Sequence, residues 1–217
     1  MPPIVFVHGL SASSRWWRAV VPLLDGRDAR LLDLPRFGRH FRPEGVTDWL
    51  VGEIESEAPV VLVGHSMGGL VCARLAAERP ELVHALVLIA PAGAPAPRSL
   101  ASYATGLART FLSVRPRLLR TIAEDAIRTG PEALVHGALF ATGAGFVGEV
   151  TRPTLLIWGA RDRLIPVALA AEWQRAIPQA RLEVIDEAAH VPMVEAPSVF
   201  AERLLSFLDN LEDGAGV

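Results

Sequence analysis

The sequence predicts an α/β protein built on a mainly parallel six-stranded sheet flanked by helices. Apolar runs rich in β-branched residues alternate along the chain with segments of helical periodicity, and this order of elements favours a parallel sheet. The runs are apolar almost throughout, as expected for strands that helices cover on both faces. We place the strands at Ile4–Val7, Arg30–Leu34, Val60–Val63, Ala85–Ile89, Thr154–Trp158 and Leu182–Ile185.

The segments between these strands predict helices and one large insertion. Helical periodicity indicates helices at about 15–24, 46–57, 68–79, 167–176 and 197–209, the third of them ended by Pro80. The connection 93–150 is long, and it carries helix-like runs around 98–113, 116–129 and 131–141. Because so long a connection inside a compact domain is usually a functional insertion, we divide the chain into a core, 1–92 and 151–217, and a helical cap insertion, 93–150.

Composition argues against several classes of function. The net charge of −3 lacks the basic surplus of a nucleic-acid-binding protein, and the absence of lysine excludes Schiff-base chemistry on that residue. Cys72 is the single cysteine and the six histidines are scattered, so we expect no disulfide, no metal and no cofactor. No apolar run reaches the roughly 18 residues that a membrane span requires. The chain starts without a basic segment ahead of its first apolar run, so we expect a cytoplasmic protein.

The motif with the most chemical information follows the third predicted strand. It reads Gly64-His65-Ser66-Met67-Gly68 and leads directly into a predicted helix. A sharp turn from strand to helix forces the serine into a strained backbone conformation, and a side chain at either flanking glycine would crowd the turn. The turn presents the Ser66 hydroxyl at a helix N-terminus, where the N–H of Met67 can face developing negative charge. The strand–turn–helix context makes Ser66 a candidate nucleophile.

With this motif the sequence resembles the α/β-hydrolase superfamily over nearly its whole length. The resemblance implies that Val5-Phe6-Val7-His8-Gly9-Leu10 forms the strand and loop of the oxyanion hole, in which Leu10 and Met67 supply backbone N–H groups. It also implies that the strand and loop 154–166 present the triad acid, and that 189–197 contain the histidine loop and the start of the last helix. The two N-terminal strands of many family members are absent, which is why we expect six strands.

Reasoning from strand positions selects the same catalytic residues. In open α/β sheets the reacting groups lie beyond the carboxyl ends of the strands. Ser66, Asp162 and His190 each follow a predicted strand, in the order serine, acid, histidine that this fold uses. Asp186 and Glu187 are rivals of Asp162, but they precede His190 by a few residues on the same loop. We therefore expect His190 to act as general base and Asp162 to orient it.

The substrate pocket is less well defined by the sequence. We place Trp16 at its border, although core packing is the default for a tryptophan. We place Leu107, Phe111 and Phe140 from the cap in its apolar lining; the alternative is a cap that forms a rigid extra layer without contact to substrate. Arg36 stands where many relatives carry a small residue; it either attracts an anionic substrate or is a solvated surface arginine. The remaining histidines have structural interpretations, His8 in the oxyanion loop and His65 pointing away from Ser66.

The sequence thus predicts a serine hydrolase that cleaves a carboxylic ester of a small, largely apolar substrate through an acyl-enzyme. The elbow residue is serine, which argues against the dehalogenases and epoxide hydrolases of the family, since these use aspartate. Thioesterase, lactonase and carbon–carbon bond hydrolase remain enzyme alternatives on the same residues. A non-catalytic small-molecule receptor is the alternative from another class, because fold does not fix function. The sequence does not indicate an oligomeric state.

Overall fold

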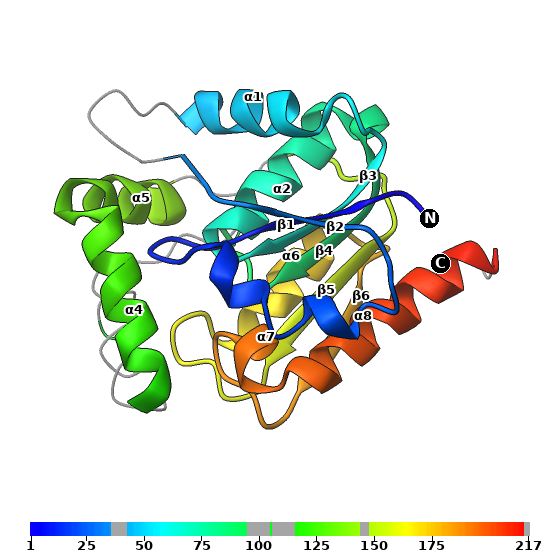
Figure 1. Ribbon diagram of the computed structural model, residues 1–217. Coiled ribbons are helices and arrows are strands. Elements are labelled where there is room, and N and C mark those ends of the chain that lie inside the picture. The colour runs from blue at the N-terminus through cyan, green and yellow to red at the C-terminus, as the bar shows by residue number, and fades with distance from the viewer. Residues whose placement is uncertain (36–42, 95–104, 106–115, 144–147, 215–217) are drawn as a thin grey trace.

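In the computed structural model, six parallel strands form one twisted sheet with helices on both faces (Figure 1). The structure describes residues 1–35, 43–94, 105, 116–143 and 148–214. The strand order is β2-β1-β3-β4-β5-β6, and each neighbouring pair is parallel. The predicted fold class and the six-stranded parallel sheet are confirmed. The strands are β1 Ile4–Val7, β2 Ala29–Leu32, β3 Val60–His65, β4 Val83–Ile89, β5 Thr154–Gly159 and β6 Arg181–Ile185.

Alternate side chains of the central strands enter two separate cores, because successive residues of a strand point to opposite faces. In β3, Val60 and Leu62 belong to one apolar cluster, and Val61 and Val63 belong to the other. The first cluster packs under α1 (Pro43–Ile54), α2 (Met67–Glu78) and α6 (Ala170–Ala176). The second packs under α8 (Pro197–Glu212) and the short helix η1 (Ser14–Trp17). Burial on both faces explains why the strands read as continuous apolar runs.

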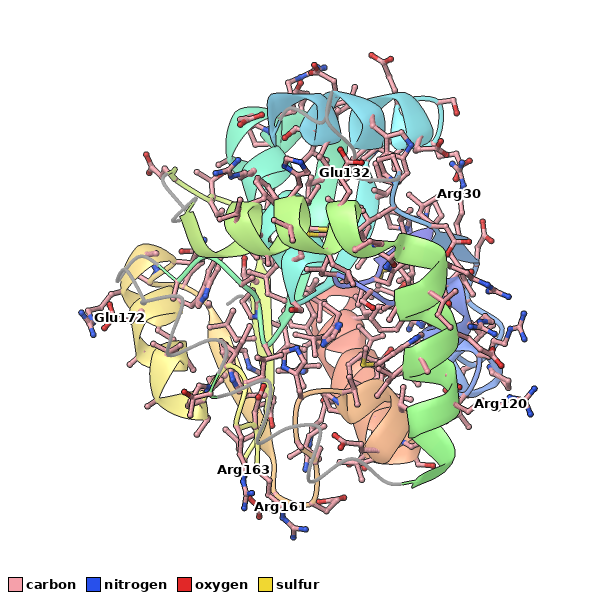
Figure 2. All side chains as sticks on the ribbon, turned by 90° about the vertical axis from the view of Figure 1, so that its left-hand side faces the viewer. Arg30, Arg120, Glu132, Arg161, Arg163 and Glu172 are labelled. Atoms are coloured by element: carbon pink, nitrogen blue, oxygen red, sulfur yellow. The ribbon has the colours of Figure 1, made fainter. Side chains whose placement is uncertain are left out.

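Two helices of the 93–150 connection lie at the carboxyl end of the sheet. They are α4 (Pro116–Thr129) and α5 (Pro131–Gly143), close to the predicted runs 116–129 and 131–141. In Figure 1 the strands run away from the N-terminus toward the side on which α4 and α5 stand. Figure 2 looks onto that side, with α5 crossing the view and α4 running down one edge. The remaining predicted run, 98–113, lies outside the described residues apart from position 105.

The predicted helix at 15–24 is wrong. The segment forms two 3₁₀ turns, η1 and η2 (Val21–Leu23), separated by Arg18–Val20. Pro22 has no N–H to donate to a continuous helix, so the segment breaks into shorter turns. Trp17 nevertheless anchors it, since its buried ring lies 4.9 Å from that of Phe6, centroid to centroid. This anchor holds the end of the loop that follows β1.

Three further short helical elements lie in the connections between strands and longer helices. They are η3 (Pro80–Leu82), η4 (Val167–Leu169) and α7 (Pro192–Glu195), of which α7 follows the His190 loop directly. Among the described helices, none is both long enough and apolar enough to cross a membrane.

Candidate active site

Ser66 sits at the turn between β3 and α2 in a conformation that side chains rarely adopt. Its φ is 51° and its ψ is −117°. The Ser66 N–H donates to the carbonyl of Ile89, the last residue of β4, at 2.9 Å, and the Ser66 carbonyl accepts from the N–H of Ala92, just after β4, at 3.0 Å. These bonds hold the strained turn in place. Ser66 is partly exposed, whereas its neighbours His65 and Met67 are buried.

The two glycines of the motif are required by close backbone contacts. A Cβ on Gly64 would lie 2.7 Å from both the carbonyl oxygen of Gly68 and the Cα of Gly69. A Cβ on Gly68 would overlap the carbonyl oxygens of Val7 and His8 at the end of β1. Any side chain at either position would therefore push α2 away from the sheet. This packing is the reason for a glycine two residues before and two residues after Ser66.

His190 and Asp162 form a buried pair on the loops after β6 and β5. The His190 Nδ1 lies 2.8 Å from Asp162 Oδ2. Asp162 Oδ1 accepts two further bonds, from the N–H groups of Leu164 at 2.8 Å and Ile165 at 2.9 Å. Because an ionised carboxylate only accepts, Nδ1 carries a proton, and in the neutral imidazole the lone pair is then on Nε2. His190 is thus held in the tautomer that a general base requires.

The structure places Asp162, not Asp186, against His190. Asp186 and Glu187 are exposed, whereas the Asp162 side chain is fully buried beside the imidazole. Among the described residues, His190 forms two hydrogen bonds: its ring pairs with Asp162, and its backbone carbonyl accepts from His65. Neither of these bonds involves Ser66. In proteins without substrate, catalytic hydrogen bonds often tighten only when substrate binds.

Backbone contacts fix the loop that carries His190. Glu195 at the end of α7 accepts with one carboxylate oxygen from the N–H groups of Ala189 at 2.7 Å and Val191 at 3.2 Å. Gly159 at the end of β5 lies so close to the carbonyls of Ala188 and Ala189 that a Cβ there would overlap them. The residues on both sides of His190 are therefore held by the core of the molecule.

His65 supports the same loop from the other side. Its Nε2–H donates to the His190 carbonyl at 2.9 Å, and the two rings lie 4.8 Å apart, centroid to centroid. Burial, and then the proximity of His190, hold the pKa of His65 well below its ordinary value. His65 is consequently neutral. Its buried Nδ1 has no hydrogen-bond partner among the described residues. That this side chain points away from Ser66 stays a prediction.

The loop after β1 passes directly beside Ser66. A Cβ on Gly9 would lie 3.0 Å from the Cβ of Ser66, which brings the following residue, Leu10, next to the elbow. His8 Nδ1–H donates to the Gly9 carbonyl at 2.7 Å, and His8 Nε2 accepts from the N–H of Leu34 at 3.0 Å. Burial lowers the pKa of His8, so the ring stays neutral and makes both bonds. Ser11 has a positive φ of 56°.

A cavity of about 370 Å³ opens along this loop. Its lining comes from the loop 8–13, from 33–35 after β2, from Met67, and from Asp125, Arg128 and Thr129 of α4. The cavity thus joins the end of the sheet to the first helix of the 93–150 connection. Its wall carries both charge signs, Arg128 on one hand and Asp33 and Asp125 on the other.

The predicted pocket residues have different positions. Trp16 is partly buried, and its Nε1–H donates to Asp125 at 2.7 Å. Phe140 of α5 is buried in the core cluster that contains α2, with the guanidinium of Arg74 5.0 Å from its ring centroid. Neither residue lines the cavity beside Met67. Leu107, Phe111 and Arg36 lie outside the described residues, and a role for any of these in substrate binding stays a prediction.

Three site contacts were not predicted from the sequence. They are those of Glu195 with the His190 loop, of the His65 Nε2–H with the His190 carbonyl, and of Asp125 with the 13–16 segment. Each acts on a segment remote in sequence or through the backbone, which leaves no pattern of side chains to detect. In the part of the chain that the structure describes, no group of three His, Cys, Asp or Glu side chains could hold a metal ion.

A parallel α/β sheet with serine at a strained strand–helix turn, and a paired histidine and aspartate on later loops at the same edge, has the architecture of an α/β hydrolase. The family description "Alpha/beta hydrolase family" matches residues 4–203, and the chain belongs to this family.

Individual relatives agree with that assignment. The chain is 28% identical to a pimeloyl-[acyl-carrier protein] methyl ester esterase of Aeromonas hydrophila, with 95% of each chain covered. It is 32% identical to the enzyme of the same name from Aromatoleum aromaticum, over 90% of this chain and 94% of that one. Among solved structures, a bacterial membrane phospholipase A superimposes with a TM-score of 0.81 at 24% identity, covering 97% of this chain and 79% of that one. This likeness shows the fold.

Proposed function

We propose that the protein is a serine carboxylesterase that cleaves an ester of a small, largely apolar substrate through an acyl-enzyme on Ser66. The observation that carries the proposal is the geometry of the buried pair: His190 Nδ1 lies 2.8 Å from Asp162 Oδ2, so the neutral imidazole that a general base requires has its proton on Nδ1 and its lone pair on Nε2. The similarity to pimeloyl-[acyl-carrier protein] methyl ester esterases supports ester cleavage over other reactions of the family.

The reaction uses the residues in a defined order. His190 Nε2 takes the proton of Ser66 as its oxygen attacks the ester carbonyl, and Asp162 stabilises the imidazolium that results. The N–H groups of Met67 and Leu10 donate to the oxyanion of the tetrahedral intermediate. His190 then protonates the leaving alcohol, and a water molecule repeats the sequence to release the acid. No metal or cofactor takes part in any step.

The 93–150 connection supplies part of the binding site in this proposal. Three residues of α4 line the cavity that also contains Met67, so substrate bound there would contact both the core and the cap. The apolar residues Leu107, Phe111 and Phe140 belong to the same insertion. We propose that the cap limits the access of water and selects among acyl or alcohol groups.

The test is covalent labelling combined with turnover. The purified protein is treated with a fluorophosphonate and analysed by intact-protein mass spectrometry, and hydrolysis of p-nitrophenyl esters of different chain length is measured. We expect one adduct, mapped to Ser66, and measurable hydrolysis. Labelling without turnover on a broad panel of esters, thioesters and lactones would instead indicate a binding role. Labelling at another residue would contradict the proposal.

A further inference from the structure

The buried carboxylate of Asp125 in α4 is hydrogen-bonded to residues 13–16, which follow the loop containing Leu10. The Asp125 side chain is 1% exposed. Its Oδ2 accepts from Ser13 Oγ at 3.1 Å and from Trp16 Nε1 at 2.7 Å, and its Oδ1 accepts from Arg15 at 2.6 Å. All three donors come from four consecutive residues of the core. A buried charge requires such partners, so α4 and this segment are fixed to each other.

A second helix of the insertion contacts the same loop three residues earlier. A Cβ on Gly137 of α5 would overlap the Leu10 side chain. Leu10 therefore packs directly against the α5 backbone, and the absence of a side chain at position 137 permits this approach. Both α4 and α5 thus touch the stretch 10–16, which also passes beside Ser66.

The loop itself has few bonds of its own that could fix Leu10. At its start, the Gly9 carbonyl accepts from His8; at its end, the Ser13 carbonyl accepts from the N–H of Trp16 at 3.1 Å. Ser14 is bonded to Asp33 through its N–H at 2.6 Å and its hydroxyl at 3.1 Å. Between these ends lies Ser11 with its positive φ of 56°. The direction of the Leu10 N–H is therefore set by how the ends of the loop are held.

We propose that Asp125 is a positioning residue for the oxyanion hole. It ties the cap to the 13–16 segment, and the Leu10 N–H faces Ser66 only while α4 and α5 are docked on this loop. The inference rests on the proposed esterase function, because an oxyanion hole has meaning only if Ser66 attacks a carbonyl. Both carboxylate oxygens of Asp125 already accept hydrogen bonds from protein donors. We therefore assign Asp125 to holding the loop and not to binding substrate.

The test compares Asp125→Asn with Glu124→Gln. Both carboxylates bind Arg15, at 2.6 Å and 3.0 Å respectively, but only Asp125 also binds Ser13 and Trp16. Glu124 is partly exposed and also pairs with Arg120, which points outward from α4 into solvent in Figure 2. Glu124→Gln is therefore the matched control, and it should leave kcat within about twofold of the parent, as surface ion pairs contribute little.

For Asp125→Asn we expect kcat for a p-nitrophenyl ester to fall about 10- to 100-fold, with KM changed less than about threefold. Removal of a whole oxyanion donor costs about 10²–10³ in kcat, and a displaced donor costs less. The Ki of an alkyl trifluoromethyl ketone, whose adduct with serine mimics the tetrahedral intermediate, should rise in parallel with the loss of kcat. A rise in KM alone would overturn the proposal, because it would make Asp125 a substrate-binding residue.

A second variant covers the case in which Asp125→Asn is poorly folded. In Arg15→Gln/Asp125→Asn, two neutral amides can hydrogen-bond each other across the same contact, and kcat and Ki should recover toward the parent by at least about fivefold relative to Asp125→Asn. Failure of the double variant to recover, in a protein that is folded by circular dichroism, would overturn the proposal. Failure of the parent protein to label or to hydrolyse esters would instead contradict the esterase function itself.

Discussion

The two sides of the active site are held by different parts of the molecule. The His190 side is fixed by the core, through Asp162, through Glu195 and through the close approach of the loop to Gly159. The oxyanion side, loop 8–16, is fixed partly by the core at His8 and partly by α4 and α5 of the insertion. In the proposed mechanism, proton transfer therefore depends on contacts within the core, and oxyanion stabilisation depends also on the two helices of the 93–150 connection.

This division has a consequence for how the site can vary. A change in the cap can alter both the cavity lined by α4 and the direction of the Leu10 N–H, while the His190–Asp162 pair stays unchanged. Substrate preference and oxyanion stabilisation are then linked through the same two helices. The following predictions test this difference, from the largest expected effect to the smallest.

Ser66 lies between the two sides, so its removal should abolish the contribution of both. We expect Ser66→Ala to lower kcat by about 10⁴-fold or more and to eliminate the fluorophosphonate adduct, with the fold intact. Steady-state ester hydrolysis and circular dichroism measure the two parts of this prediction. Near-normal turnover by the variant would show that another residue is the nucleophile.

On the His190 side, the orienting acid should have the next largest effect. Asp162→Asn keeps the shape of the side chain but favours the wrong tautomer of His190, and we expect kcat to fall about 10³- to 10⁴-fold. The matched control is Asp186→Asn on the exposed loop nearby, which should change kcat less than about twofold. If the Asp186 variant proves the more damaging, the assignment of the acid is wrong.

The backbone support of His190 should matter less, and independently of the cap. Glu195→Ala leaves the N–H groups of Ala189 and Val191 without their acceptor, so we expect about 1–3 kcal/mol lower free energy of unfolding and about tenfold lower kcat. Glu195→Gln retains an acceptor oxygen and should lose much less. Urea denaturation and ester hydrolysis measure both quantities.

Combination with Asp125→Asn sharpens the comparison. Because Glu195 and Asp125 share no partner in the described hydrogen bonds, their effects on log kcat should add. A large departure from additivity would show that the two sides are mechanically coupled.

The smallest expected effect is on stability at mildly acidic pH. Burial lowers the pKa values of His8 and His65 in the folded protein, so below about pH 6.5 the unfolded chain binds protons that the folded chain does not. The free energy of unfolding should therefore fall as the pH falls from about 6.5, by at most about 1.4 kcal/mol per pH unit for each histidine. It should be restored as the pH rises.

The variant His65→Gln measures how much of this pH dependence of the free energy of unfolding comes from His65, on the His190 side of the site. Glutamine can still donate to the His190 carbonyl but does not titrate, so the slope measured by urea denaturation between pH 7 and 5 should become shallower. A slope equal to that of the parent protein would mean that His65 does not contribute.

The sequence predicted the fold well, and it led to three candidate catalytic residues, because the patterns behind both are local. Gly64 is required by contacts within its own turn and Gly68 by the end of the adjacent strand β1, and continuous apolar runs identify strands that are buried on both faces. Asp162 followed from its place after a strand. In each case the residue type and its neighbours in the sequence contain the physical reason.

The supporting contacts could not be predicted in the same way. The Asp125 carboxylate meets Arg15 across 110 positions of sequence, and neither residue belongs to a pattern that indicates the other. Asp125 reads as one more charge of an amphipathic helix. The 15–24 error has a related cause, since apolar periodicity does not show where Pro22 interrupts a helix.

Cys72 gives the molecule a built-in probe of the turn at Ser66. It is the single cysteine of the chain, it is fully buried in α2, and its Sγ lies 2.9 Å from the position a Cβ on Gly64 would occupy. Burial raises the pKa of its thiol, so thiolate-directed reagents should reach it only when α2 separates from the sheet. The rate of its modification in native buffer is then a direct reading of how often this part of the protein opens.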